Sequence, residues 1–366
     1  MRVLIAPGPF GGGLGAVAAA AAIAEGWSRR APQDDLVLAP VSDGGEGYVD
    51  VLHACLGGDL VRSTVPDAHG RPTAAIVLLV ERTAYVETSQ VVGANIVAGD
   101  DPERASSFGV GLLVADAVAA GAERVVVGVG ATGVATNDGG AGLLAGLGAT
   151  SAPPDALRDG SRGLDALTRV DLAPALLLTG RTRLTLATDD EVPLLGPLGT
   201  TNTAGPGRGI RADRLPIVDS RLERLADEVG RRHALASPAG AGGGIGFALL
   251  CVGAAKLPGL GSVLDEIALA ASAAQADLVV TGERAFDLSA GSGLIVTGVA
   301  VVAGSVVRPC IALADRVLVG ARETRALGLE SAYSVRDLVG DSGTGEPAGD
   351  VAAAAERVAR TWSWAH

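Results

Sequence analysis

Strand and helix patterns alternate at both ends of the chain. Residues 2–6 are apolar, residues 16–28 form an alanine-rich stretch, and residues 35–40 are apolar again, which predicts a strand, a helix and a strand. The end of the chain resumes this order, with helices expected near 262–275, 296–304 and 351–362 and strands at 277–281, 310–314 and 331–334. Such alternation is typical of a parallel α/β sheet. We therefore expect both ends to share one sheet, with four residues on neighbouring strands: Ile5, Val37, Val279 and Ile311.

The middle of the chain has a different pattern. Short β-rich runs between residues 61 and 92 are separated by turn residues and predict an antiparallel meander. Further on, we expect helices at 109–120, 141–147 and 218–235, strands starting at Arg124 and Leu184, a polar connection at 151–168 and a glycine loop at 240–246.

These patterns predict an α/β protein of two domains. A Rossmann- or flavodoxin-like parallel-sheet domain would be built from residues 1–58 and 265–366. A mixed α/β domain would be inserted at residues 59–264, with the active-site cleft between the two.

Composition supports a globular protein and excludes several classes of function. Of the 366 residues, 48% are hydrophobic and 19% charged, which supplies a core and argues against disorder. The 53 glycines are about twice the usual share of about 7%, but they lack the triplet period of collagen. A net charge of −12 argues against partners such as nucleic acid or an anionic membrane.

Lysine, cysteine and histidine narrow the chemistry further. Lys256 is the only lysine, which excludes a Walker A loop and confines Schiff-base chemistry to that position. The three cysteines and four histidines lack metal or disulfide spacing. The N-terminus reads as a strand rather than a signal peptide, and the uncharged stretches 234–255 and 288–307 read as glycine loops feeding buried helices. We therefore expect a soluble, cytoplasmic protein.

Five expected strand ends are followed by loops rich in glycine and carboxylates. Ligands of open α/β sheets bind outside the carboxyl ends of strands, where glycine lets backbone amides approach an oxyanion. Carboxylates there can hold Mg²⁺ with a phosphate or accept a proton from a hydroxyl. One such loop is ordinarily only a turn, whereas five indicate a ligand site: residues 7–13, 42–47, 136–140, 188–193 and 281–287.

A dinucleotide-binding oxidoreductase is a weaker alternative. Residues 11–16 fit the pattern G-x-G-x-x-[G/A] after a strand. However, the acid that would bind the ribose would be Asp43, further along the chain than the usual spacing of about 20 residues.

Together, these loops resemble the bacterial glycerate kinase family over nearly the whole chain. The family signatures Asp-Gly-Gly-Glu-Gly and Ala-Thr-Asn-Asp-Gly-Gly-Ala-Gly are intact at residues 43–47 and 135–142. Its opening loop and its Thr-Thr-Tyr-Gly-Val-Gly motif appear in changed form at residues 6–13 and 106–111. Two intact signatures in the family's order make the resemblance specific.

The resemblance implies ATP-dependent phosphorylation of glycerate, with Mg²⁺, in an interdomain site. The family loop Cys-Asp-Val-Asp-Asn-Pro-Leu places its two acids at Asp189 and Glu191, and Arg208 stands where the separate family motif Gly-Pro-Gln-Lys-Gly has lysine. Asp189 and Asp287 are then the expected catalytic residues, for acid/base or metal roles, and Asp189 and Glu283 the expected Mg²⁺ ligands. The expected substrate- or nucleotide-binding residues are Asp43, Gly44, Gly45, Glu46, Asn137, Asp138, Gly139, Gly140, Arg208, Glu283 and Arg284.

Some of these residues have a second reading. Loop bracing through hydrogen bonds from side chain to backbone accounts for Asp43 and Asn137 equally well. Glu283 and Asp138 are considered for either metal or ribose contacts.

The sequence departs from the family at several charged positions. Family cations are replaced by Gly11, Ala285 and Leu294, and Arg208 and Arg284 are the candidate replacements. Losing one preorganised charge typically costs about 2–4 kcal/mol of transition-state stabilisation. Two hypotheses follow: a kinase that uses Mg·ATP on D-glycerate or a similar small hydroxy acid, and a family member that has lost catalysis and acts as a binding or interaction protein. The sequence leaves self-association open.

Overall fold

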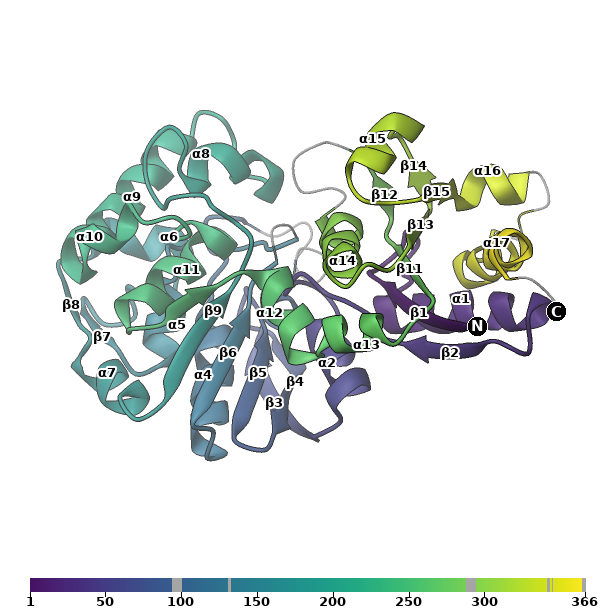
Figure 1. The fold of residues 1–366 in the computed structure, drawn as a ribbon. Coiled ribbons are helices and arrows are strands. Elements are labelled where there is room, and N and C mark those ends of the chain that lie inside the picture. The colour runs from purple at the N-terminus through teal and green to yellow at the C-terminus, as the bar shows by residue number, and fades with distance from the viewer. Residues whose placement is uncertain (94–100, 131–132, 288–293, 341–342, 344, 364–366) are drawn as a thin grey trace. The chain divides into compact units, whose positions relative to one another are not determined.

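The structure, a computed structural model, has two compact units (Figure 1). It describes all residues except 94–100, 131–132, 288–293, 341–342, 344 and 364–366. Unit 1 comprises Met1–Asp43, Asp50–Leu56 and Leu260–His366, and unit 2 comprises Gly44–Val49 and Gly57–Gly259. In this division residues 44–49 group with the inserted unit.

Unit 1 contains a five-stranded parallel sheet made from both ends of the chain. The strand order is β15-β13-β11-β1-β2, and every neighbouring pair is parallel. Ile5 pairs with Leu38 on one side and with Val280 on the other, and Val280 pairs with Ile311. The prediction that both ends share one sheet is confirmed. The strands are β1 (Arg2–Pro7), β2 (Asp35–Leu38), β11 (Leu278–Gly282), β13 (Cys310–Ala314) and β15 (Ser331–Ser334).

Helices cover both faces of this sheet. On one face, α1 (Ala16–Arg30) packs against α17 (Pro347–Trp362), and the buried Ile23 and Trp27 of α1 join the core formed by alternate strand residues. On the other face, α14 (Leu294–Ser305) packs against β11 and β13. Burial on both faces explains why these strands are continuous apolar runs.

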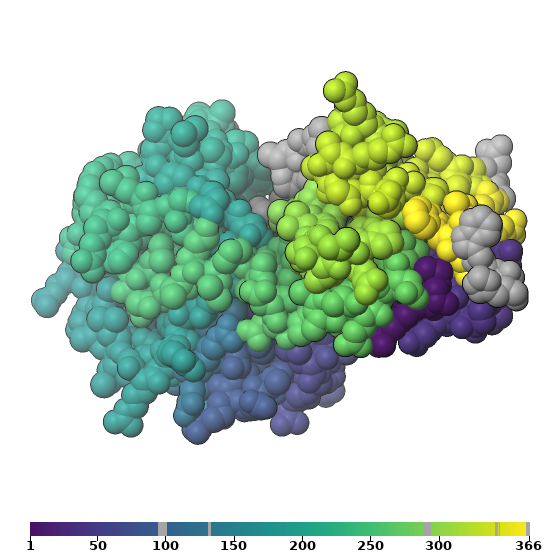
Figure 2. All heavy atoms as spheres, in the orientation of Figure 1, coloured from purple at the N-terminus to yellow at the C-terminus, as the bar shows by residue number. Residues whose placement is uncertain are grey.

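The remaining elements of unit 1 are short. The helix expected at 262–275 is two helices, α12 (Gly259–Glu266) and α13 (Leu269–Ala274), because Ala268 adopts a left-handed conformation with φ 49°. Helix α15 (Ala321–Ala326) stands out on the surface and exposes every residue except Thr324 (Figure 2). The other elements are α2 (Tyr48–Leu56, which begins in unit 2), α16 (Val335–Val339), β12 (Ala285–Phe286) and β14 (Arg316–Val317).

Unit 2 is built on a six-stranded mixed sheet of order β10-β9-β6-β5-β4-β3. Strands β3, β4 and β5, the first three in the chain order of this unit, pair antiparallel, as the meander prediction expected. From β5 onwards the pairs are parallel, with Val86 opposite Val127 and Val127 opposite Leu186. The strands are β3 (Asp59–Pro66), β4 (Pro72–Val80), β5 (Thr83–Glu87), β6 (Arg124–Gly128), β9 (Arg183–Ala187) and β10 (Ala255–Leu257).

Short helices surround this sheet. The helix expected at 218–235 is divided at Gly230, and the expected polar connection contains a helix, a 3-10 turn at Leu164–Ala166 and part of a small hairpin. The elements are α3 (Ser89–Val92), α4 (Phe108–Ala119), α5 (Ala141–Gly146), α6 (Gly160–Gly163), α7 (Ala173–Thr179), α8 (Thr200–Ala204), α9 (Leu215–Val229), α10 (Arg231–Ala234), α11 (Ala241–Cys251), β7 (Thr150–Ala152) and β8 (Arg169–Asp171).

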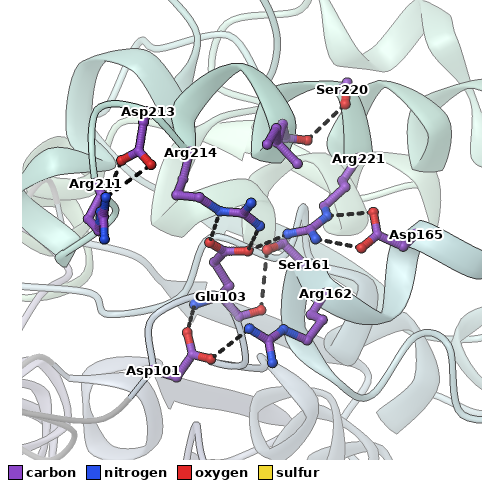
Figure 3. Close-up of polar contacts among 11 residues, drawn as sticks. Asp101, Glu103, Ser161, Arg162, Asp165, Arg211, Asp213, Arg214, Ser220 and Arg221 are labelled. Carbon is purple, nitrogen blue, oxygen red and sulfur yellow. Dashed lines mark hydrogen bonds and ion pairs between the residues drawn. The ribbon is translucent and has the colours of Figure 1, made fainter.

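A largely buried ion-pair network holds α9 onto the rest of unit 2 (Figure 3). The Glu103 carboxylate accepts two hydrogen bonds from Arg214, at 2.7 and 2.8 Å, and one from Arg221 at 2.5 Å. Arg221 also donates to both oxygens of Asp165. The side chains of Glu103 and Arg221 are 9% and 6% exposed. The hydrogen bonds from Arg214, followed by those from Arg221, lower the pKa of Glu103 to about 2 although burial opposes this.

All three cysteines are unpaired. Cys310 is buried, and Cys55 and Cys251 are half-buried. Burial raises the pKa of the Cys55 thiol to about 11 and those of Cys251 and Cys310 to about 12. Among the residues that the structure describes, no helix has the length and apolar character needed to cross a membrane.

Candidate functional site

The signature loop of unit 2 lies at the carboxyl ends of two of its parallel strands. A Cβ at Gly44 would lie 3.2 Å from the carbonyl oxygen of Ala187, the last residue of β9. A Cβ at Gly128, the last residue of β6, would lie 2.7 Å from the carbonyl oxygen of Gly44. The signature loop at residues 44–47 therefore lies against the ends of β6 and β9, the edge at which open α/β sheets bind ligands. Within this loop Gly44 and Gly45 are buried and Glu46 is exposed.

Glu87, which the sequence analysis did not single out, braces this loop. It is the last residue of β5 and is 5% exposed. Its carboxylate accepts hydrogen bonds from the backbone amides of Gly47 and Val49 at 3.1 and 3.0 Å, and from the Ser89 hydroxyl at 2.5 Å. An acid that ends an otherwise apolar strand was the one available signal for this role.

The turn at residues 136–140 packs against a glycine turn at the start of α11. The Thr136 hydroxyl donates to the Gly242 carbonyl at 3.1 Å, and the Gly139 amide donates to the Gly243 carbonyl at 3.0 Å. Gly243 has φ 73°, and a Cβ there would lie 1.8 Å from the Thr136 carbonyl oxygen. Only glycine satisfies both the conformation and the close approach. The expected glycine loop thus supports the second signature motif.

Asp138 is fully buried and ties two helices together. One oxygen accepts from the Ser107 amide and hydroxyl, both at 2.8 Å, and from the Gly142 amide at 3.1 Å. The other accepts from the Gly140 amide at 2.9 Å. Burial raises the pKa of Asp138, and these hydrogen bonds oppose the shift. The geometry gives Asp138 a bracing role, and its contact with a metal or a ribose stays a prediction.

Asn137 and the half-buried Arg208 form a polar cluster with two buried threonines. The Nη1 atom of Arg208 donates to Asn137 Oδ1 at 2.7 Å and to Thr200 Oγ1 at 2.9 Å. Asn137 Nδ2 donates to Thr201 Oγ1 at 2.9 Å. Asn137 therefore bonds side chains of the 200–208 segment rather than the backbone of its own loop.

Two adjacent acids follow β9. Asp189 Oδ1 accepts from the Gly259 amide at 3.1 Å. Asp190 accepts from the Val192 amide at 3.1 Å, and burial raises the pKa of its carboxyl group while the charge of Arg208 lowers it. Asp190 was not among the predicted residues, since the family loop has valine at this place and acids on either side.

Glu191 and Lys256 form an ion pair in the same unit. The Lys256 ammonium donates to the Glu191 carboxylate, which also accepts from the Ser237 hydroxyl. The hydrogen bond from Lys256, followed by that from Ser237, lowers the pKa of Glu191. The single lysine of the chain is thereby held at this carboxylate.

In unit 1 the predicted residues follow β11. Glu283 Oε1 accepts from the Val296 amide near the start of α14 at 3.0 Å. Arg284 is exposed, and its Cγ lies 3.5 Å from the point that a Cβ at Gly11 would occupy. Asp315 Oδ2 lies at the same distance from that point. The stem of Arg284 therefore runs beside the position where the family carries a cation.

A hollow of about 390 Å³ adjoins this position within unit 1. Its described lining includes Phe10, Gly11 and Asp315, the last of which binds Arg336 at 3.0 Å. The hollow lies at the carboxyl ends of β1, β13 and β15, which in parallel sheets is the edge used for ligands.

The predicted residues are thus divided between the two units. Asp189, Asn137, Asp138 and Arg208 belong to unit 2, together with the glycines of both intact signatures. Glu283, Arg284 and Asp287 belong to unit 1, as does Asp43. The convergence of the two sets stays a prediction.

The predicted metal ligands are two of these acids. Among the described residues no three side chains of His, Cys, Asp or Glu come together as a metal site. Mg²⁺ in phosphoryl transfer is usually held by one or two carboxylates together with substrate phosphates. Asp189 and Glu283 fit that requirement in ligand chemistry, since each offers a carboxylate at the end of a parallel strand.

Comparison with known proteins agrees with the fold and the motifs. The model of the glycerate kinase family matches residues 3–363. An uncharacterized protein of Mycobacterium bovis is 38% identical over 93% of this chain and 85% of its own length. A glycerate kinase of Bacillus subtilis is 33% identical over 92% of this chain and 90% of its own. The crystal structure of a putative glycerate kinase 2 from Salmonella typhimurium superposes with a TM-score of 0.82 at 31% identity, covering 99% of this chain and 98% of the other. The resemblance and the α/β fold expected from the sequence are confirmed, and the chain belongs to the glycerate kinase family.

Proposed function

We propose that this protein transfers the γ-phosphoryl group of Mg·ATP to a hydroxyl of D-glycerate or of a similar small hydroxy acid. The observation that carries the proposal is the family match over residues 3–363, with relatives that are named glycerate kinase. In the balanced reaction, ATP and the hydroxy acid give ADP, the phosphorylated acid and one proton.

The arrangement of charges in unit 2 supports this chemistry. Phosphoryl transfer depends mainly on positioning the reactants and on neutralising charge on the transferred group. Arg208 is held by Asn137 and Thr200, and Asp189 follows a parallel strand of the same sheet. In the proposed reaction Asp189 or Asp287 accepts the proton of the substrate hydroxyl, and Mg²⁺ bound with ATP neutralises phosphate charge.

The position of Arg284, in unit 1, supports a protein that has retained catalysis. The hypothesis of a catalytically inactive binding protein was motivated by the missing family cations. One of these cations is missing at Gly11, and Arg284 Cγ lies within van der Waals distance of the point that a Cβ at Gly11 would occupy. The Arg284 guanidinium can therefore supply positive charge to the same region from a neighbouring strand end.

A coupled assay tests the proposal. ADP formation would be followed with D-glycerate, ATP and Mg²⁺, with glycerol and water as alternative acceptors. We expect ADP formation that requires D-glycerate, and a loss of at least 100-fold in kcat for Asp189→Asn, on the scale of removing a general base. Asp213→Asn is the matched control, because Asp213 is exposed and, among the described residues, bonds Arg211 alone. If a folded protein forms ADP no faster than the background with D-glycerate and with other small hydroxy acids, the proposal is refuted.

A further inference from the structure

The guanidinium of Arg208 is bonded on one side only. Its Nη1 atom makes both of its hydrogen bonds, to Asn137 and Thr200, and no described residue accepts from Nε or Nη2. No carboxylate among the described residues forms an ion pair with it. An arginine carries five N–H donors in a fixed planar fork, so most of this donor set is unused.

Arg208 is half-buried, which makes this unused capacity significant. Burial lowers the pKa of Arg208 to about 10, and the negative charge of Asp190 opposes the shift. The group nevertheless remains charged at neutral pH. A charge that is partly removed from water favours a hydrogen-bonded counter-ion, because it has lost part of its hydration. Both hydrogen-bond partners of Arg208 are neutral, and Asp190 acts on it only through its charge.

The neutral partners also fix the orientation of the guanidinium. Asn137 and Thr200 are each 1% exposed, and Asn137 is itself held by Thr201, which is completely buried. A fork held in this way presents its remaining donors without further ordering, which favours two-point binding of a planar oxyanion.

The charge of the surroundings selects a small anion. The negative charge of Asp190 acts on Arg208 from the loop after β9. Asp190 repels every anion at this site, but it repels a singly charged carboxylate less than a polyphosphate, which carries several negative charges. We infer that the unused N–H groups of Arg208, held in place by Asn137 and Thr200, bind the carboxylate group of the hydroxy-acid substrate. This inference rests on the proposed function and names the part of the acceptor that unit 2 recognises.

Asp190 then sets how tightly that carboxylate binds. Replacing it with asparagine removes the nearby negative charge and leaves the amide oxygen to accept from Val192. Asp190→Asn should therefore tighten carboxylate binding, whereas Arg208→Gln should weaken it about 10- to 100-fold, the range for losing a charge-assisted hydrogen-bonded pair.

Binding measured without nucleotide tests the inference separately from catalysis. Isothermal titration calorimetry would compare D-glycerate with D-glyceramide, its neutral amide, on the full chain. We expect the unmodified protein to prefer D-glycerate at least 10-fold and Arg208→Gln to lose this preference. Arg211→Gln is the matched control, since Arg211 is 79% exposed and its one ion-pair partner in the described part of the chain is Asp213. If Arg208→Gln does not fold, Arg208→Lys, which restores the lysine of the family and keeps the charge but loses the planar fork, should keep a preference for D-glycerate over D-glyceramide and bind the acid less tightly than the unmodified protein.

The outcomes separate this inference from the proposed function. D-glycerate binding through Arg208 without ATP consumption would refute the kinase proposal and leave the inference standing. If ADP formation depends on D-glycerate and Arg208→Gln leaves the KM for D-glycerate unchanged, the kinase proposal stands and the inference about Arg208 is refuted. The inference is also overturned if the unmodified protein binds the acid and the amide equally, or binds neither. Arg208→Gln that weakens ATP instead of D-glycerate overturns it as well.

Discussion

Replacing Glu103 with glutamine tests how far the ion-pair network stabilises unit 2. The substitution keeps the size of the side chain and one carbonyl acceptor, but removes the negative charge between Arg214 and Arg221. Arg221 would then keep only Asp165, whose side chain is 56% exposed, as its charged partner. A buried charge that loses a partner is strongly destabilising, whereas exposed pairs contribute about 0–1 kcal/mol.

The shifted pKa of Glu103 gives the magnitude. Lowering the pKa from 4.5 to about 2 corresponds to about 3 kcal/mol, at 1.36 kcal/mol per pH unit. Arg214 is 33% exposed, so solvent screening reduces this figure. We expect Glu103→Gln to lower the free energy of unfolding by about 2–3 kcal/mol at pH 7.

The sign of the pH dependence follows from the same shift. A carboxyl group whose pKa is lower in the folded state than in the unfolded state stabilises the fold above the unfolded value of 4.5. This contribution is lost as the pH falls from about 4.5 toward 2. The stability difference between the unmodified protein and Glu103→Gln should therefore be constant from pH 6 to 8 and about 1 kcal/mol smaller at pH 3.5.

Urea denaturation followed by far-ultraviolet circular dichroism measures these differences. Tryptophan fluorescence is unsuitable, because the two tryptophans that the structure describes, Trp27 and Trp362, belong to unit 1. Amide hydrogen exchange would localise the effect, with faster exchange expected in α9 and unchanged exchange in α1. The control is Glu223→Gln, since Glu223 is 49% exposed and pairs with an exposed Arg231. A loss for Glu103→Gln no larger than for the control, or a difference that grows as the pH falls, would show that the reasoning is wrong.

Three further outcomes are expected. Because family cations are missing at Gly11 and Leu294, Mg·ATP should stabilise the unmodified protein only weakly in a thermal-shift assay. The double variant Gly11→Lys, Leu294→Lys should raise the affinity for Mg·ATP or the turnover rate, and a large shift with ordinary turnover in the unmodified protein would contradict the prediction. Gly243→Ala should lower the free energy of unfolding by at least about 2 kcal/mol in chemical denaturation, because the added Cβ would overlap the Thr136 carbonyl. Gly253 has a similar positive φ but open space around it, so Gly253→Ala should cost only about 1 kcal/mol, and equal losses would refute the overlap argument. Asp138→Asn should destabilise unit 2 by about 2–4 kcal/mol, because an amide NH₂ would face donors, and hydrogen exchange at the starts of α4 and α5 would reveal it.

Periodic patterns made most of the fold predictable. Strands buried on both faces are short apolar runs, so β1, β6, β11 and β13 could be read from the sequence within a residue or two. Helix breaks were missed where one residue interrupts an otherwise continuous pattern, at Gly230 and Ala268. Helix α2 was missed because it begins directly after a signature glycine loop that reads as a turn.

Long-range polar contacts could not be predicted in this way. Glu103 and Arg221 are 118 residues apart, and nothing local to either marks the other as its partner. In the candidate site, glycine and acid clusters identified the loops, and the structure brings two of them together at the ends of β6 and β9. Glu87 and Asp190 were missed because their surroundings, and not their neighbours in sequence, give them their roles.

The native thiols leave the chain open to selective chemical labelling. Thiolate, the reactive form, is scarce at neutral pH for groups whose pKa lies near 11 or 12, as for Cys55, Cys251 and Cys310. A cysteine introduced at an exposed position of each unit, such as Arg322 and Arg181, would therefore react with a maleimide dye well before the native ones. A donor and an acceptor fluorophore attached in this way would report, molecule by molecule, whether adding Mg·ATP or D-glycerate changes the separation of the two dyes.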